Sequence, residues 1–303
     1  MASREQNPSS YTAFGLKAEA EPLAPGLHVV ATPIGNLKDI SFRALSTLAA
    51  ADLVLAEDTR VSRHLLAHYG ISTPLQAYHE HNAAEMRPKI MERLRAGQAL
   101  ALISDAGTPL VSDPGFKLVE SAVAEGFSVV PIPGPSAVLA ALVAAGLPTD
   151  RFFFEGFLPP KATARRERLA LLGSIPATLV FFESPRRLSD MLADAASLFG
   201  DRPAAVAREL TKLFETVRRG PLTVLAADYA AAPTPKGEIV VLIGPPTEEA
   251  HSIIGETDLD DRLRVQLARL SIKDAAAIVA EDTGLPRRQV YARAVALARG
   301  DEP

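Results

Sequence analysis

The 303-residue chain contains no cysteine. This absence excludes disulfides, thiolate nucleophiles, and zinc or iron–sulfur sites with cysteine ligands, and it fits a reducing compartment. Long hydrophobic runs are also missing, because charges, glycine or proline interrupt every apolar stretch before the roughly 18–20 residues that a membrane helix requires. We therefore expect a cytoplasmic protein that does not enter a membrane.

The chain also lacks an excess of positive charge. It has 32 Lys and Arg residues against 36 Asp and Glu residues, which gives a net charge of −4. A chain of this charge does not attract a polyanion as a whole, and this argues against a nonspecific nucleic-acid coat protein. Local basic groups remain, each fitting either a solvated helix face or a local contact: Lys161 with Arg165, Arg166 and Arg168; Arg186 with Arg187; Arg218 with Arg219; and Arg287 with Arg288.

The sequence divides into an extension and three structured units. Residues 1–25 lack the apolar core of a signal peptide, and their small, polar and proline residues predict a flexible extension. Residues 26–147 alternate continuous apolar runs with amphipathic segments, which predicts an α/β domain with a mostly parallel sheet. Residues 148–245 carry less regularly spaced runs, which predict a second α/β domain with a mixed sheet.

The end of the chain is different in character. Residues 246–257 form a polar linker after two prolines, and residues 258–303 contain three short helical segments. Their spacing resembles a helix-turn-helix, with Gly284 at the turn. A small helical bundle without a nucleic-acid role would show the same pattern, so both interpretations stay open.

The stretch ALALISDAGTPLVSDPG (99–115) indicates a ligand loop, because an apolar strand ends abruptly in two turns. Gly107 and Gly115 can take positive φ and let a ligand approach the backbone, while Pro109 and Pro114 stiffen the turns. Open α/β sheets bind ligands at the carboxyl ends of their strands. An ordinary strand-to-helix turn is the alternative, but it would not need the polar side chains of Asp105, Thr108, Ser112 and Asp113.

Further polar loops follow other predicted strands, at 31–41, 56–66, 131–138, 181–188, 207–215 and 236–244. None has the glycine pattern of a dinucleotide fingerprint or the Gly-Lys-Ser/Thr of a Walker loop, so NAD-binding and P-loop interpretations lose support. The segment YHEHNAAE (78–85) raises a metal hypothesis. His79 and His81 are two residues apart and share a face only in a strand, and no third ligand is obvious, so we expect no metal site.

The ordered series TPIGNL, AEDTR, SDAGTPLVSDPG, PGPSA, FFESPRR, ARELTK and KGE resembles the tetrapyrrole-methylase superfamily of S-adenosylmethionine-dependent methyltransferases. Within it, the chain is most similar to the branch that methylates a cytidine ribose 2′-oxygen of 16S ribosomal RNA in the small subunit. The resemblance implies two α/β domains with a cofactor cleft between them, a small C-terminal helical domain, a homodimer, and 16S rRNA as partner.

The resemblance also implies which residues lie near S-adenosylmethionine. Thr108 stands where the superfamily's Gly-Asp-Pro motif has an aspartate, which removes any role that needs a carboxylate there. The implied cofactor-binding residues are Pro33, Asp105, Gly107, Thr108, Pro109, Val111, Ser112, Ser136, Ala137, Phe182, Ala207 and Gly237.

Methyl transfer to an alcohol needs alignment of the reacting atoms and a group that takes or shares the hydroxyl proton. Candidate proton acceptors are Glu183, Glu209, Asp58, His79 and Lys212. The predicted catalytic residues are Glu183 and Arg186 first, because a strand end flanked by arginines can join a base to a phosphate clamp, and then Glu209 and Lys212. The predicted RNA contacts are Arg60, His79, Arg186, Arg208, Arg287 and Arg288.

Two rival functions remain. One keeps the fold but methylates a tetrapyrrole or another small molecule. The other is a nucleic-acid-binding regulator that uses the C-terminal helices.

Overall fold

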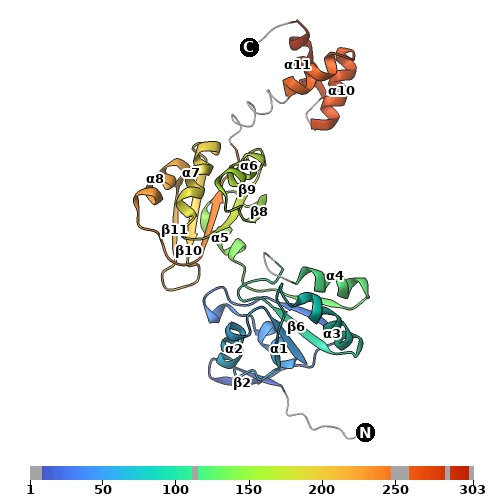
Figure 1. The fold of residues 1–303 in the computed structure, drawn as a ribbon, viewed down its shortest axis with the longest axis vertical. Coiled ribbons are helices and arrows are strands. Elements are labelled where there is room, and N and C mark those ends of the chain that lie inside the picture. Colours follow the sequence, from blue (N-terminus) through green and yellow to red (C-terminus); the bar gives the residue numbers. More distant parts are fainter. Residues whose placement is uncertain (1–8, 111–114, 247–258, 284–286, 300–303) are drawn as a thin grey trace.

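The computed structural model describes residues 9–110, 115–246, 259–283 and 287–299. Val111 and Ser112, two of the predicted cofactor residues, lie outside this part of the chain. The described residues form two five-stranded sheets covered by helices, a two-stranded hairpin and a separate group of C-terminal helices (Figure 1). This architecture is the predicted α/β fold.

The first sheet is parallel throughout, with strand order β5-β4-β6-β3-β7. Alternate strand residues face opposite sides, and each side has its own apolar core. Helices α1 and α2 cover one side and helices α3 and α4 cover the other. The bounds are β3 Gly26–Val30, α1 Phe42–Ala50, β4 Leu53–Ala56, α2 Thr59–His68, β5 Leu75–Ala77, α3 Ala83–Arg95, β6 Ala99–Ile103, α4 Phe116–Ala124 and β7 Val129–Ile132.

The second sheet is mixed, as predicted. Its order is β11-β10-β12-β9-β8; the β8–β9 pair is parallel and the other pairs are antiparallel. Helices α6, α7 and α8 pack on one face. The bounds are β8 Phe152–Phe157, α6 Ala162–Leu172, β9 Thr178–Glu183, α7 Leu188–Phe199, β10 Pro203–Arg208, β11 Thr216–Pro221, α8 Leu222–Ala231 and β12 Ile239–Ile243.

Helix α5 (Ala137–Ala145) covers the other face of the second sheet, although it follows β7 of the first. Its buried residues, among them Val138 and Leu142, pack against Ala205 and Leu242 of the sheet. The sequence boundary at residue 147 assigns this helix to the first domain. The structure places it in the second core, because α5 is apolar on nearly every side and the second sheet offers an uncovered apolar face.

The predicted extension over residues 1–25 is partly structured. Strands β1 (Ser10–Ala13) and β2 (Leu16–Glu19) form an antiparallel hairpin. The amide of Thr12 donates to the carbonyl of Tyr69 at 2.7 Å, and Tyr11 packs against the core beside α1. The expectation of a flexible segment therefore fails over these residues. Composition concealed the hairpin, because small and polar residues form most of it.

The C-terminal unit has the three predicted helices: residues 259–267, α10 (Ile272–Thr283) and α11 (Arg287–Arg299). They share a small core that includes Leu263, Val279 and Val290. Gly284, the predicted turn residue, lies outside the described residues. Among the helices that the structure describes, none is long and apolar enough to cross a membrane.

Truncation on α5 tests whether its inner face holds the second domain together. Leu142 is 3% exposed, so Leu142→Ala is expected to lower the free energy of unfolding by about 2–5 kcal/mol through lost burial and a cavity. Val143, one residue along, is 81% exposed, and Val143→Ala is expected to stay within about 0.5 kcal/mol of the unmodified protein. Urea unfolding measures both. Equal effects of the two variants would contradict this packing.

Candidate active site

Three loops of the first sheet meet at its carboxyl edge, where β3, β6 and β7 end. Thr32 after β3 and Gly107 after β6 exchange two backbone hydrogen bonds, at 2.8 and 3.0 Å. The Thr108 hydroxyl donates to the carbonyl of Pro135 in the loop after β7 at 3.2 Å. Ser136 then caps α5, its hydroxyl accepting from the amide of Leu139. These bonds fix the loops relative to one another.

The second sheet presents one edge to these loops. Strands β8, β9 and β10 end there and β12 begins there, because β12 runs antiparallel to β9 and β10. The rings of Phe157 and Phe182 lie 5.7 Å apart at this edge. Side-chain alternation decides which residues face the first domain: Phe182 and Ala207 do, whereas Phe181 and Val206 point into the core on the opposite face.

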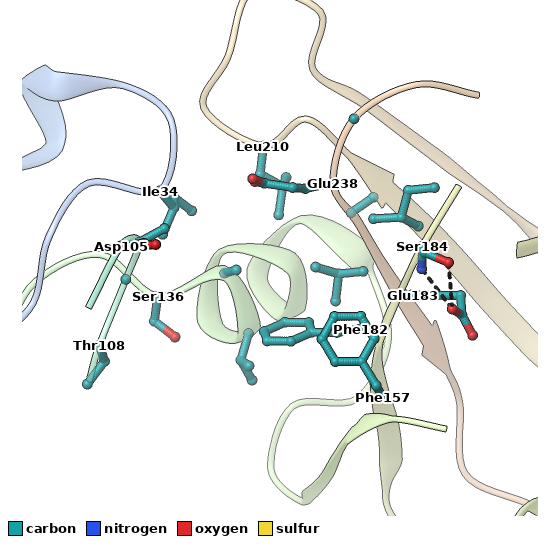
Figure 2. Close-up of a pocket in the computed structure, with 18 of the residues that line it drawn as sticks. Ile34, Asp105, Thr108, Ser136, Phe157, Phe182, Glu183, Ser184, Leu210 and Glu238 are labelled. Atoms are coloured by element: carbon teal, nitrogen blue, oxygen red, sulfur yellow. Dashed lines mark hydrogen bonds between the residues drawn. The ribbon is translucent and has the colours of Figure 1, made fainter. Parts of the chain in front are cut away.

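A cavity of about 520 Å³ lies between the two edges (Figure 2). The predicted cofactor residues that line it are Asp105, Gly107, Thr108, Ser136, Ala137, Phe182, Ala207 and Gly237. The predicted Pro109 is buried and does not line it. Lining residues that were not predicted are Ile34, Glu57, Ala106, Val138, Phe157, Ser184, Pro185, Leu210, Glu238, Ile239 and Val240. Several of these residues belong to the polar loop motifs identified in the sequence, and that membership was the signal that could have found them.

A smaller cavity of about 230 Å³ adjoins the first. The two share Ile34, Asp105, Ala106 and Glu238, which form a common wall. The predicted residues Pro33 and Lys212 line the smaller cavity. Its other lining residues come from the loops after β3 and β6 and from α2: Thr32, Gly35, Leu37, Val61, Ser62, His64, Leu65 and Ser104.

Left-handed backbone occurs at three non-glycine residues beside these cavities: Leu110 (φ 75°), Glu209 (φ 54°) and Thr211 (φ 67°). Such conformations cost free energy and persist only where the surroundings enforce them. Leu110 follows the Gly107–Pro109 turn in the first domain, and Glu209 and Thr211 follow β10 in the second. The strain is therefore concentrated at the two loops that face each other across the cleft.

Lys212 of the second domain lines the smaller cavity, with its aliphatic chain close to Gly35 of the first domain. Its Nζ lies 2.9 Å from Glu209 Oε1 and 3.1 Å from Glu238 Oε2. Burial acts to lower the pKa of Lys212, but the two carboxylates outweigh it and hold that pKa above its ordinary value. The same contact lowers the pKa of Glu209. A protonated Lys212 cannot accept a proton, and a paired Glu209 is a weak base.

Glycines allow this placement of Lys212 and Glu209. A Cβ on Gly35 would lie 2.5 Å from Lys212 Cγ, and a Cβ on Gly237 would lie 2.3 Å from the Glu209 carboxyl group. Both glycines also have positive φ, at 156° and 95°. The close approach of backbone and side chain therefore requires glycine at both positions.

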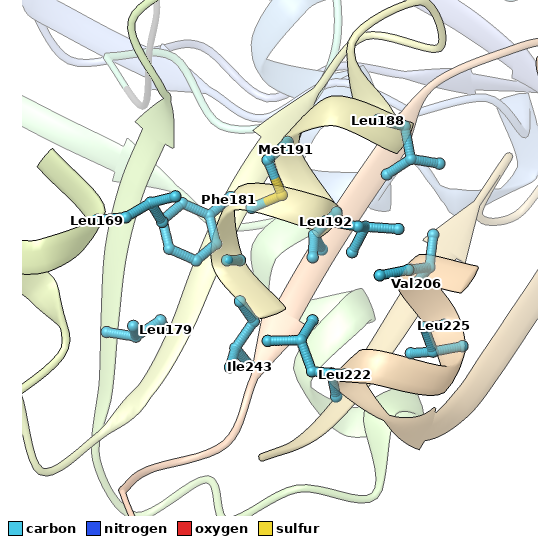
Figure 3. Close-up of a cluster of buried hydrophobic side chains, with 14 of the residues drawn as sticks. Leu169, Leu179, Phe181, Leu188, Met191, Leu192, Val206, Leu222, Leu225 and Ile243 are labelled. Atoms are coloured by element: carbon cyan, nitrogen blue, oxygen red, sulfur yellow. The ribbon is translucent and has the colours of Figure 1, made fainter. Parts of the chain in front are cut away.

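Glu183, the first predicted catalytic residue, also lines the larger cavity, and its carboxylate turns toward Ser184 (Figure 2). It follows Phe182 in the strand, so its side chain points to the core side, where Phe181 and Leu188 lie (Figure 3). Its Oε1 accepts from the Ser184 amide at 2.7 Å and pairs with Arg187 at 3.2 Å. Burial raises the pKa of Glu183, against the hydrogen bond from Ser184 and the charge of Arg187. These contacts fix the carboxylate within the second domain.

The predicted Arg186, Arg60 and Arg208 lie outside both cavities. Arg186 is exposed. Arg60, 86% exposed at its side chain, pairs with Asp58, whose pKa its hydrogen bond lowers to about 2. Arg208 donates to the carbonyls of Lys236 and Phe214 and so holds a loop.

The remaining predicted contacts are His79, Arg287 and Arg288. His79 lies in the loop before α3, where its amide donates to Asn82. Arg287 and Arg288 are exposed at the start of α11. Within the described residues, no group of three or more His, Asp or Glu side chains is arranged to hold a metal ion.

Comparisons with protein families match two models in this chain. The model described as "Tetrapyrrole (Corrin/Porphyrin) Methylases" matches residues 26–226, and the model described as "RsmI C-terminal HTH domain" matches residues 254–298. Among curated proteins, "Ribosomal RNA small subunit methyltransferase I" of Mesorhizobium japonicum is 56% identical, over 92% of this chain and 94% of that protein. The protein of the same name from Pseudomonas aeruginosa is 52% identical, over 89% and 96%.

Solved structures share the fold. A cobalt precorrin-4 methyltransferase aligns with TM-score 0.54 at 20% identity, over 72% of this chain and 94% of its own. Diphthine synthase aligns with TM-score 0.57 at 18% identity, over 72% and 89%. A uroporphyrin-III C-methyltransferase from Thermus thermophilus, solved with S-adenosylhomocysteine, aligns with TM-score 0.51 at 20% identity, over 72% and 96%.

The pH dependence of stability tests the structural role of Glu183. A carboxyl whose folded pKa is raised above its ordinary value near 4.5 stabilises the fold most when protonated. The free energy of unfolding of the unmodified protein, relative to Glu183→Gln, should therefore fall as pH rises through and above that value. Urea unfolding at a series of pH values measures this difference. A difference that rises with pH would show instead that the ion pair with Arg187 dominates.

Proposed function

The chain belongs to the tetrapyrrole methylase family, and from that membership we propose that it uses S-adenosylmethionine to methylate RNA of the small ribosomal subunit. The finer proposal is that the acceptor is a cytidine ribose 2′-oxygen of 16S rRNA. The cytoplasmic location and the homodimer expected from the sequence stay predictions.

The observation that supports an RNA substrate is that both family models match the same chain. The cobalt precorrin-4 methyltransferase and the uroporphyrin-III C-methyltransferase align over 94% and 96% of their own length but leave over a quarter of this chain unmatched. The C-terminal model over 254–298 and the rRNA methyltransferase relatives at 52–56% identity account for the chain beyond the methylase model. A small-molecule methylase gives no reason for this addition.

The larger cavity suits S-adenosylmethionine on its own features. Its volume of about 520 Å³ lies within the roughly 300–1,000 Å³ of typical ligand pockets. The carboxylates of Glu57, Asp105 and Glu238 give it a negative wall, which favours a positively charged sulfonium. Phe157 and Phe182 offer aromatic surface for a cation or a ring.

S-adenosylmethionine supplies a methyl carbon whose bond to sulfur breaks as its bond to the ribose oxygen forms, the electron pair staying on sulfur. The chain must hold the acceptor in line and take the hydroxyl proton. Asp105 is placed for this, because it lines both cavities. Its Oδ1 accepts from the Asp58 amide at 2.9 Å, which orients the carboxylate. We therefore assign the role of proton acceptor to Asp105 rather than to Glu183.

Removing the Asp105 carboxylate should stop proton transfer without unfolding the protein. Asp105→Asn is expected to lower kcat by about 10²–10⁴-fold, the usual contribution of a general base. The measurement is incorporation of labelled methyl groups into small ribosomal subunits and 16S rRNA. Asp52→Asn is the matched control: Asp52 also accepts one backbone amide, that of Ala99 at 2.8 Å, but lines neither cavity. Equal kcat for the two variants would rule out Asp105 as base.

The exposed arginines at the start of α11 should contact RNA phosphates. The double variant Arg287→Ala/Arg288→Ala is expected to raise KM for the RNA and to reduce the slope of log KM against log salt by roughly 0.7 for each lost contact with single-stranded RNA. Lys17→Ala, an exposed cation on β2, is the control. If the unmodified protein methylated a tetrapyrrole but not ribosomal RNA, the proposed function would be overturned.

A further inference from the structure

We propose that the smaller cavity, lined by α2 and by the loops after β3 and β6, holds the nucleoside of the target nucleotide. This inference rests on the proposed function and adds a substrate subsite to it. The cavity is called the nucleoside cavity below.

Position is the first argument. The nucleoside cavity shares the wall of Ile34, Asp105, Ala106 and Glu238 with the larger cavity. A group bound in one therefore lies directly beside a group bound in the other, with Asp105 at the boundary. In-line transfer requires this adjacency of donor and acceptor.

An unsatisfied hydroxyl is the second argument. Ser62 lies on α2 and is 2% exposed, and its Oγ has no hydrogen-bond partner among the described residues. A buried hydroxyl without a partner costs about 1–3 kcal/mol, and such a group in a folded protein calls for an explanation. Because Ser62 lines the nucleoside cavity, a ligand with a polar edge would supply the missing partner.

The charge of the cavity selects the kind of ligand. The carboxylates of Asp105 and Glu238 line it, and the one lysine, Lys212, is already paired with Glu209 and Glu238. This wall disfavours a phosphate. It suits a neutral group with hydroxyl or amino donors, and the side chains of Leu37, Val61 and Leu65 provide an apolar surface for a ring.

Size and surroundings agree with a single nucleoside. The volume of about 230 Å³ falls below the roughly 300–1,000 Å³ of pockets for drug-sized ligands, so the cavity suits one unit of the chain rather than a stretch of RNA. Arg60 and Arg63, three residues apart on α2, are exposed beside the lining residues Val61 and His64. Cations at that position can hold the flanking phosphates outside the cavity.

Filling the cavity from an exposed position gives the sharpest test. Val61 is 48% exposed, so Val61→Trp can occupy the cavity without disturbing the core. The expected result is at least a hundredfold loss of kcat/KM for small-subunit RNA, with an unchanged Kd for S-adenosylmethionine by calorimetry. Val123→Trp, at a residue 61% exposed on α4 that lines neither cavity, is the control and should keep full activity.

A second variant removes one hydrogen bond and does not depend on bulk. Ser62→Ala should lower kcat/KM for the RNA about tenfold, with the same Kd for S-adenosylmethionine and a Tm no lower than that of the unmodified protein, because the removed hydroxyl has no partner among the described residues of the free protein. Ser121→Ala is its control, because the Ser121 hydroxyl bonds to Lys117 within α4.

The outcomes separate the inference from the proposed function. Absence of RNA methylation by the unmodified protein overturns the proposed function, and the inference with it. Methylation by the unmodified protein, with Val61→Trp or Ser62→Ala as active as its control, overturns the inference alone. Loss of S-adenosylmethionine binding in Val61→Trp also overturns it, because the smaller cavity would then belong to the cofactor.

Discussion

The packing of α5 onto the second sheet is the interaction on which the rest of the site depends. The helix begins where β7 of the first sheet ends, yet its buried side chains belong to the second core. One rigid element is thus anchored in both domains and sets the distance between their edges. Its first turn supplies Ser136, Ala137 and Val138 to the larger cavity. The cavity is therefore a consequence of how an apolar helix is shared, and its shape depends on that helix staying buried.

The polar cluster of Glu209, Lys212 and Glu238, at the edge of the second domain, has a different role. The ion pairs of Lys212 with Glu209 and Glu238 are partly exposed, and such pairs contribute little to stability. Their geometry is nevertheless enforced, by glycine at residues 35 and 237 and by the strained backbone of Glu209. Because the ion pairs add little stability, we infer that the strained backbone serves to position the side chains that form them. The position gained is that of Glu238 in the wall between the two cavities.

The sequence predicts most strands and helices of the two sheets because continuous apolar runs bounded by glycine and proline are strong signals. The apolar strand predicted at the start of the 99–115 stretch is observed as β6 (Ala99–Ile103). β5 is only three residues long and half-buried, and the β1–β2 hairpin consists largely of small and polar residues, so neither gives such a signal.

Side-chain direction limited prediction of the site. Glu183 and Phe182 belong to one motif and both line the cavity, but strand alternation turns the Glu183 carboxylate toward Ser184 and Arg187. The same parity separates Ala207 from Arg208. A motif reports that a loop matters, whereas the register of the strand before it decides which of its residues face the ligand. For α2 the helical period has the same effect, and it places Ser62 inside and Arg63 outside.

The net charge of −4, which argues against a nonspecific nucleic-acid coat protein, is consistent with an RNA enzyme when the positions of the charges are considered. The carboxylates Glu57, Asp105 and Glu238 gather at the cavities, where a sulfonium and a neutral nucleoside would bind. Exposed arginines lie on α2 and α11, where phosphates would be met. RNA binding depends on the local field at the contact, not on the total. An acidic interior also repels the phosphates that flank a target nucleoside, so the same charges that would hold the cofactor would keep the RNA backbone at the rim.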